Sequence, residues 1–150
     1  MAKIMIIILV VLMVGLLLFV FYIHETRLLS AYETQSIQIG NTELAVYIAD
    51  TPEKRARGLM EISTLSPCAG MMFLFPDTSI RTFWNKNTLI DLDILWIADG
   101  HVVGISTLPA VTQSSNVVTV SSPVATNIVV EVNKGWAEEH GIEVGDVMTR

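Results

Sequence analysis

The residues of this sequence that could do chemistry gather in the segment TFWNKNTLIDLDIL, from Thr82 to Leu95. Asp91 and Asp93 are two residues apart, so in an extended strand their side chains project from the same face, with roots roughly 6–7 Å apart. Paired carboxylates can carry out acid/base hydrolysis, as in glycosidases. The alternative is that Asp93 is a structural carboxylate, hydrogen-bonded or ion-paired with nearby Lys86, and we favour it.

The aromatic and amide residues of the same segment are candidates for a binding site. Strand alternation directs one of Phe83 and Trp84 inward and the other outward. An outward Trp84 beside Lys86 and Asn87 could line a ligand cleft. Asn87 and Thr88 are equally typical of a turn whose side chains bond to nearby backbone. The sequence leaves a binding site and a structural turn both open.

A short helix is predicted upstream of this segment. Thr51 can cap it, Pro52 suits its first position, Glu53 suits the positive end of its dipole, and Gly58 ends it.

Arg57 and Met60 lie at the end of that helix. They are either a surface guanidinium and a packed thioether, or part of a site. In a site, Arg57 would face the cluster of Trp84 and Asp93 and bind a carboxylate or phosphate through its planar fork.

Other common site types lack their residues. His24, His101 and His140 have no ligand spacing, so we expect no metal site. The chain has no Gly-x-Ser-x-Gly elbow and no phosphate-binding glycine loop with its lysine, and we expect no cofactor. Cys68 is the single cysteine, so it cannot form an internal disulfide.

The elements that must position the candidates read as mostly strand. Runs of extended residues, separated by turn signals, predict two hairpins and three or four further strands. The hairpins span 36–50, around Gly40 and Asn41, and 92–107, with Asp99 and Gly100 at the tip; the other strands are 70–75, 116–122, 127–133 and a terminal one after Gly145, with a second helix within 133–141. The predicted fold class is mainly β, a compact rolled sheet or barrel of about seven short strands with two short helices. No connection looks like a full crossover helix, so we expect no parallel pairing.

Residues 4–23 form an apolar run without charge or proline, and about 20 helical residues span one bilayer core. We predict an uncleaved transmembrane anchor at 1–24, a tether at 25–34 and a β-rich domain at 35–150. A cleaved signal peptide is the alternative, but its apolar region is shorter and ends in small residues at alternate positions. No cysteine follows the run, which argues against a lipoprotein.

The distribution of charge bears on topology and partners. Lys3 at the amino end mildly favours a cytoplasmic amino terminus and an extracytoplasmic domain. Of the 9 basic residues only Lys3 precedes His24, whereas all 15 acidic residues follow it. This acidic balance argues against a nucleic-acid partner, because nucleic-acid binding needs a basic patch.

Several motifs, in order, resemble those of the domain of unknown function 192 family. They are ADTPEKRARGLM, ending at Met60; Gly70–Phe75; Phe83–Thr88; Leu92–Ile94; Val130–Val132 with Gly135; and HGIEVGD. The resemblance implies a small, mainly β fold that is often secreted or membrane-tethered, and it brings no established activity or catalytic residue. Asp91 departs from the proline common in the family, so a family-wide mechanism cannot need the aspartate pair. Asn85 replaces a common methionine, which adds a polar group to the site and allows different ligand contacts.

Three hypotheses follow. We favour a non-enzymatic binding or accessory module at the cell envelope, for a small polar ligand, a peptide or an envelope component. The second is a hydrolase of envelope carbohydrate or peptide that uses Asp93, and the third is a purely structural cluster. The residues we expect to bind ligand are Arg57, Met60, Trp84, Lys86, Asn87, Thr88 and Asp93.

Overall fold

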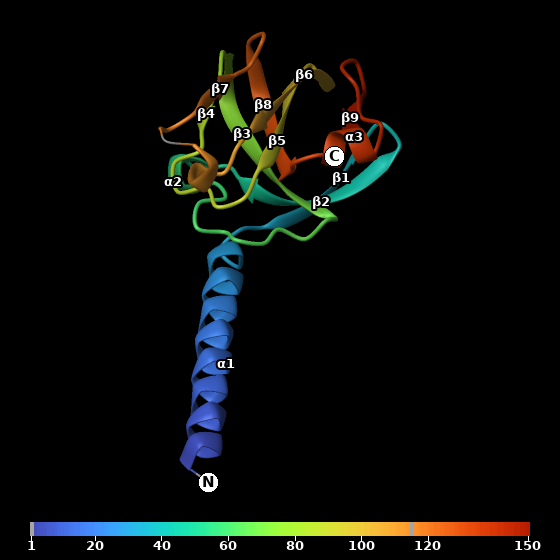
Figure 1. Cartoon of the computed structure of the whole chain (residues 1–150). Coiled ribbons are helices and arrows are strands. Elements are labelled where there is room, and N and C mark those ends of the chain that lie inside the picture. Colours follow the sequence, from blue (N-terminus) through green and yellow to red (C-terminus); the bar gives the residue numbers. More distant parts are fainter. Residues whose placement is uncertain (1, 115) are drawn as a thin grey trace. The chain divides into compact units, whose positions relative to one another are not determined.

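The computed structural model describes residues 2–114 and 116–150, except the side chains of 2 and 21–27. The chain divides into two compact units, Met1–Ala31 and Tyr32–Arg150. The first unit contains the helix α1 (Ala2–Leu29), and the second contains the sheet (Figure 1).

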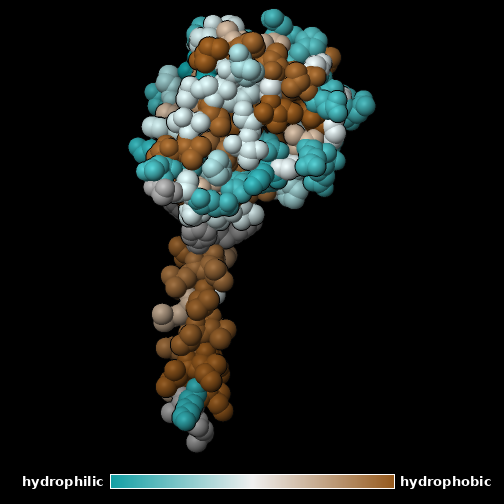
Figure 2. Space-filling view, turned by 45° about the horizontal axis from the view of Figure 1, so that its top comes forward, coloured by the Kyte–Doolittle hydropathy of each residue, from teal (hydrophilic) through white to brown (hydrophobic). Residues whose placement is uncertain are grey.

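The helix α1 is long and apolar enough to cross a membrane, with its most apolar window at Lys3–Val20. Its 28 residues correspond to about 42 Å at the α-helical rise. Residues 4–14 and 16–20 are all exposed, and Figure 2 shows mostly apolar side chains on the near side of this part of the helix. The helix continues to Leu29, and the first strand begins at Thr34, so both ends of the segment predicted as a tether carry regular structure.

The second unit is mainly β, as predicted, and its main sheet curls strongly (Figure 1). Seven strands form this sheet in the order β6-β5-β8-β3-β2-β1-β9. Their bounds are β1 Thr34–Ile39, β2 Thr42–Ala49, β3 Ala69–Ser79, β5 Leu92–Ala98, β6 His101–Leu108, β8 Thr126–Asn133 and β9 Met148–Thr149. Two further strands, β4 (Thr82–Trp84) and β7 (Thr119–Ser121), pair in a separate ribbon.

The helices of this unit are short. Helix α2 covers Pro52–Arg57, is capped by the Thr51 side chain and ends at Gly58, as predicted. Helix α3 covers Trp136–Glu139, and a 3₁₀ turn, η1, covers Val111–Gln113.

The expectation that no strands pair in parallel was wrong for one pair. Strands β2 and β3 are parallel, with Ala45 opposite Ala69 and Ala49 opposite Phe73. The chain returns from the end of β2 to the start of β3 through α2 and an irregular segment, 58–68. A parallel connection needs only enough chain to cross the sheet, and here one and a half turns of helix plus a loop are sufficient.

Strand register divides the central side chains between two faces of the sheet. We call the first the α3 face, where Met72, Val130 and Val132 pack in one core cluster with Trp136 and Ala137 of α3. We call the other the α2 face. It carries alternate residues of β3, β5 and β8, which the register places side by side: Met71, Phe73, Ile94, Trp96, Val129 and Glu131.

The β4–β7 ribbon covers the α2 face through Phe83. The Phe83 ring meets Phe73 edge-on at 4.8 Å and Trp96 at 5.6 Å between centroids. Trp84 points the other way and is 50% exposed. The predicted alternation of these two aromatic residues is therefore confirmed, with Phe83 inward.

Candidate functional site

A small cavity lies at the carboxyl end of α2, against the α2 face of the sheet. Its volume is about 30 Å³, enough for one or two water molecules. Its walls come from α2 and the turn after it, from β3, from β4 and the turn after it, and from β8. Residues that line it include Arg57, Gly58, Met60, Phe83, Trp84, Thr88 and Glu131.

A wider groove of about 240 Å³ adjoins this cavity. The two share Arg55, Ala56, Phe83 and Trp84 in their walls, and the groove adds Phe75 and Thr82. We call the cavity and the groove together the α2–β4 cleft. Its aromatic walls can hold the apolar part of a ligand, while polar groups of the small cavity can fix one end.

Glu131 is the buried charged group of this cleft. It is 5% exposed and lies between Met71 and Ile94 in the register of the sheet. Burial raises the pKa of the Glu131 carboxyl from 4.5 to about 8, so the group is mostly neutral at pH 7. Among the residues that the structure describes, none donates a hydrogen bond to this carboxyl, and no fully enclosed side-chain oxygen lacks a partner. The Glu131 carboxyl therefore borders the cavity that it lines, where a ligand or water can reach it.

Gly58 makes room for that carboxyl. It has a φ of +53°, and a Cβ placed on it would lie 3.2 Å from Cζ of Phe73 and 3.9 Å from Oε2 of Glu131. A side chain here would be strained and would also crowd the cavity. The close approach of backbone explains a glycine directly after Arg57.

The two arginines of the cleft, Arg55 and Arg57, have different contacts. Arg55 donates from Nη1 to the backbone oxygens of Asp50 at 2.6 Å and Leu74 at 2.8 Å, and lies 5.2 Å from the Phe75 ring centroid. Arg57 pairs through Nη2 with Glu61 at 3.1 Å and keeps a 40% exposed side chain. Since a guanidinium has five N–H donors, Arg57 retains donors for a ligand.

The other predicted residues of this region lie around the same cleft. Thr88 is buried and lines the cavity, whereas Lys86 is exposed and its Nζ lies 5.2 Å from the Trp84 ring centroid. Asn87 has a φ of +55° and its carbonyl oxygen accepts from the backbone N–H of Glu61 at 2.9 Å. The predicted turn is confirmed by the bond from Thr88 N–H to the Asn85 carbonyl at 3.1 Å.

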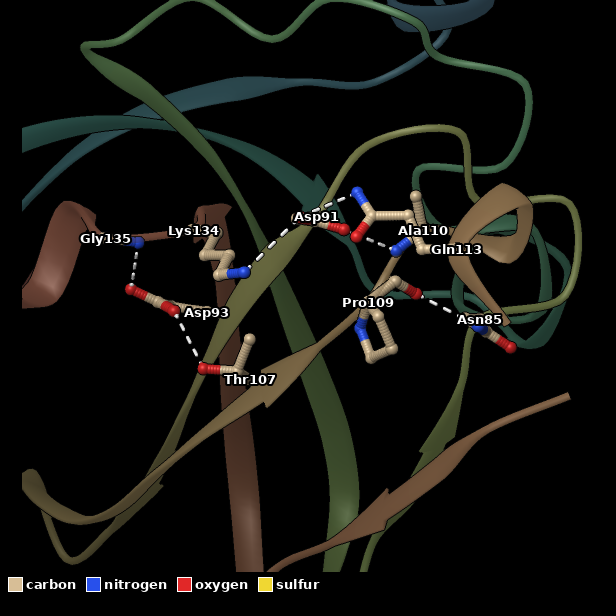
Figure 3. Close-up of polar contacts among 9 residues, drawn as sticks. All are labelled: Asn85, Asp91, Asp93, Thr107, Pro109, Ala110, Gln113, Lys134 and Gly135. Atoms are coloured by element: carbon tan, nitrogen blue, oxygen red, sulfur yellow. Dashed lines mark hydrogen bonds and ion pairs between the residues drawn. The ribbon is translucent and has the colours of Figure 1, made fainter. Parts of the chain in front are cut away.

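Asn85 itself is a structural clasp that faces away from the cavity. It is fully buried, and its Nδ2 donates to the Pro109 carbonyl at 3.0 Å (Figure 3). The same Nδ2 donates to Ser114 Oγ at 3.1 Å. Its Oδ1 accepts from the backbone N–H of Val118 at 2.8 Å. The expectation that Asn85 adds a polar group to the ligand site was wrong, because its buried side chain bonds to Pro109, Ser114 and Val118 and does not line the cleft.

Asp93 lies on the other side of the sheet. The register places it opposite Val132, on the α3 face, whereas Glu131 lies on the α2 face. Its carboxylate accepts from the backbone N–H of Gly135 at 2.8 Å and from Thr107 Oγ1 at 3.4 Å (Figure 3). It also accepts from the backbone N–H of Ala137 at 3.4 Å. Asp93 therefore holds the start of α3, as a structural carboxylate would, and its partner is not Lys86.

Asp91 has its own set of partners. Its carboxylate accepts from the Ala110 N–H at 2.7 Å and from Gln113 Nε2 at 3.0 Å, and pairs with Lys134 at 3.5 Å (Figure 3). The hydrogen bond from Ala110 is the main cause that holds the pKa of this carboxyl below its usual value. Each aspartate thus fixes a different stretch of backbone.

Four of the seven predicted ligand residues line the cavity, and Lys86 stacks on one of them. Those four are Arg57, Met60, Trp84 and Thr88. Sequence reasoning did not select Glu131 as a site residue. The sequence nevertheless contains an indication that Glu131 is buried. It is a single acid between Val130 and Val132, in a strand whose neighbouring residues are apolar on both faces, so neither face is expected to be exposed to solvent.

Comparison with known proteins gives a family and two similar structures. A candidate transcription regulator from Sinorhizobium meliloti 1021 is 31% identical with a TM-score of 0.71, over 79% of this chain and 94% of that one. A protein of unknown function from Novosphingobium aromaticivorans DSM 12444 is 30% identical with a TM-score of 0.70, over 78% of this chain and 85% of that one. None of the curated proteins compared with the chain matches it. The DUF192 family model, described as Uncharacterized ACR, matches residues 35–150. The chain therefore belongs to the DUF192 family.

Proposed function

We propose that this protein is a membrane-tethered binding module that holds a small polar ligand, a peptide end or another envelope component in the α2–β4 cleft, without chemical turnover. The proposal is based on the observation that residues from distant segments of the chain line the same cavity. Arg57, Trp84 and Glu131 come from distant segments, yet they line one cavity, and no described residue donates a hydrogen bond to the buried Glu131 carboxyl.

The tether of the proposal is α1. This helix has 28 residues, and its uncharged apolar run, 4–23, matches the thickness of a bilayer core. We propose that the amino end is cytoplasmic and residues 32–150 are outside, on the charge bias of Lys3. In that location the ligand would be a molecule of the envelope or the medium, and we expect no nucleic-acid partner.

Binding is favoured over hydrolysis because the carboxylates that could form a catalytic pair are occupied. Asp91 and Asp93 each accept hydrogen bonds from backbone and side chains that position loops and a helix. A hydrolase that uses Asp93 would have to release these bonds to act on a substrate.

A ligand screen tests the proposal. The full chain in detergent micelles is screened by thermal shift against small polar metabolites, short peptides and soluble cell-wall fragments. We expect a hit whose stabilisation disappears in Trp84→Ala and weakens in Lys86→Ala, with both variants still folded. The matched control is Val144→Ala, which removes an exposed apolar side chain outside the cleft.

Some results of this screen would contradict the proposal. If no compound stabilises the chain, or if every hit stabilises Trp84→Ala as much as wild type, the cleft does not bind ligand. If Trp84→Ala and Lys86→Ala both unfold, the cluster is structural and the third hypothesis replaces the first.

A further inference from the structure

We propose that the α2–β4 cleft takes a small organic acid, whose carboxylate enters the cavity between Arg57 and Glu131 while its apolar part lies in the groove. Glu131 would donate the O–H of its neutral carboxylic acid to one ligand oxygen, and Arg57 would donate N–H to the ligand carboxylate. This inference rests on the proposed function and names the class of ligand.

The first support is the distribution of basic residues. Beyond residue 31 the chain has seven of them, among 14 acidic residues. Two, Arg55 and Arg57, line the cavity itself, and the Nζ of Lys86 lies 5.2 Å from the ring centroid of Trp84, another lining residue. A cationic ligand would meet repulsion at this entrance, whereas an anion is attracted.

The second support is the state of Glu131 in its surroundings. Arg55 and Arg57 line the same cavity as Glu131, and Tyr32 lies within electrostatic range of Glu131, Arg57 and Lys54. Burial raises the pKa of Tyr32 above its usual 10, so this phenol is neutral. At pH 7 the Glu131 carboxyl is mostly protonated, so it offers a hydrogen-bond donor.

The third support is the pairing chemistry. A hydrogen bond from a carboxylic acid to a carboxylate is charge-assisted and is stronger than one between neutral groups. It forms only while Glu131 keeps its proton, because two carboxylates in the same small cavity repel each other. Protonation of Glu131 therefore favours ligand binding, and ligand binding in turn raises the affinity of Glu131 for its proton.

The groove fits the remainder of such a molecule. Its volume of about 240 Å³ and its Phe75, Phe83 and Trp84 walls suit one aromatic ring or a short branched chain. Thr82 adds a hydroxyl at the edge. The ligand thus combines one charged end with one compact apolar body.

Three matched probes test the ligand class: benzoate, benzyl alcohol and benzylamine. Binding to the full chain in micelles is measured by isothermal titration at pH 6 and pH 9.5, after subtraction of empty micelles. We expect benzoate to bind at pH 6 at least about tenfold more tightly than the other two, and to lose about tenfold or more at pH 9.5, where Glu131 has lost its proton.

Two variants separate a role of Glu131 from a general effect of pH. Glu131→Gln keeps a neutral donor, so we expect the ratio of benzoate affinities at the two pH values to fall below about twofold. Arg57→Gln is expected to lower affinity about tenfold at both pH values. The controls are Glu138→Gln and Lys134→Gln, exposed groups beside the α3 face, which should behave as wild type.

Each contrary result is distinct. Benzylamine binding more tightly than benzoate, or benzoate affinity that Glu131→Gln leaves pH-dependent, overturns the assignment of a carboxylate. Failure of benzoate while the screen finds another ligand lost in Trp84→Ala overturns this inference alone and leaves the proposed function standing. Failure of all three probes and of the screen overturns both.

Discussion

A single buried acid is the most informative residue of the molecule. Glu131 occupies a strand position flanked by Met71 and Ile94, where an apolar side chain would stabilise the sheet more. Its carboxyl has no donor among the described residues, so it does not hold the fold together in the way that Asp93 does. Groups that weaken a fold and face a cavity are frequent at functional sites.

Glu131 should make the stability of the protein depend on pH. In the unfolded chain its pKa is near 4.5, and in the folded chain it is about 8, so between these values the folded state holds the extra proton. The free energy of unfolding therefore falls as pH rises, by about 1.4 kcal/mol per pH unit from this group. Relative to wild type, Glu131→Gln should gain roughly 3–5 kcal/mol between pH 4.5 and pH 8.

Thermal and urea unfolding at several pH values check this expectation. Glu138→Gln, an exposed acid of α3, serves as the control and should follow wild type. Parallel profiles for wild type and Glu131→Gln would show that Glu131 is ionised in the folded state, contrary to its burial.

Asn85 should be a stability residue and not a binding residue. Asn85→Ala removes donors to Pro109 and Ser114 and leaves the Val118 N–H without its acceptor, so we expect a loss of about 2–4 kcal/mol. Asn41→Ala, at an exposed hairpin turn, should cost less than about 0.5 kcal/mol. Denaturant unfolding measures both, and an Asn85→Ala variant of wild-type stability would contradict the clasp.

Several residues of the α2–β4 cleft could be predicted from the sequence, but the buried acid Glu131 could not. Trp84 and Arg57 were identified by type and by the motifs around them, and both line the cavity. Asp93 was misplaced because register, which the sequence does not state, puts it on the α3 face. Glu131 was missed because its burial depends on which strands flank β8, and those strands, β3 and β5, are distant in the chain.

Among the elements, α3 shows how a short helix is kept in place by another strand. Its four residues begin after Gly135, which has no side chain to cap them, and the Asp93 carboxylate of β5 accepts the free N–H groups instead. We expect Asp93→Ala to cost about 1–3 kcal/mol, and Asp93→Asn less, because one amide oxygen remains.

Ligand binding in the α2–β4 cleft should survive these changes to Asp93. The control is Glu139→Ala, an exposed residue of α3 whose loss should be nearly neutral. If Asp93→Asn instead abolished a turnover of ligand without a loss of stability, the hydrolase hypothesis would regain its basis.

Local signals were sufficient for the hairpins and for α2, since Gly40, Asp99 and Thr51 act within a few residues. They were not sufficient for the parallel pair of β2 and β3. Its crossover contains only a six-residue helix, and what fixes the pairing is burial of the Met71 and Phe73 side on one face and Met72 on the other. Such non-local packing has no sequence period of its own.

The two units of the molecule differ in how far their apolar side chains are exposed. Residues 4–14 and 16–20 of α1 are all exposed, whereas the strands of unit 32–150 bury most of their large apolar side chains in the core. A helix that is apolar all round needs an apolar environment, which a bilayer provides.

The proposed orientation has a direct expectation. Protease added to intact spheroplasts should digest residues 32–150, because we place them outside the cytoplasmic membrane. A cytoplasmic protein assayed in the same sample, and resistant until lysis, confirms that the membrane is sealed. Survival of the unit before lysis, followed by its digestion after lysis, would reverse the orientation.

The central claim is that the α2–β4 cleft is where ligand binds, and methionine methyl resonances report on it most directly. Met60 lines the cavity, whereas Met148 is buried in the core cluster of the α3 face. With ¹³C-methyl methionine in the full chain, addition of the strongest ligand from the screen should shift the Met60 signal and leave Met148 in place. A Met60 signal that stays unmoved at saturating ligand would contradict a binding site in this cleft.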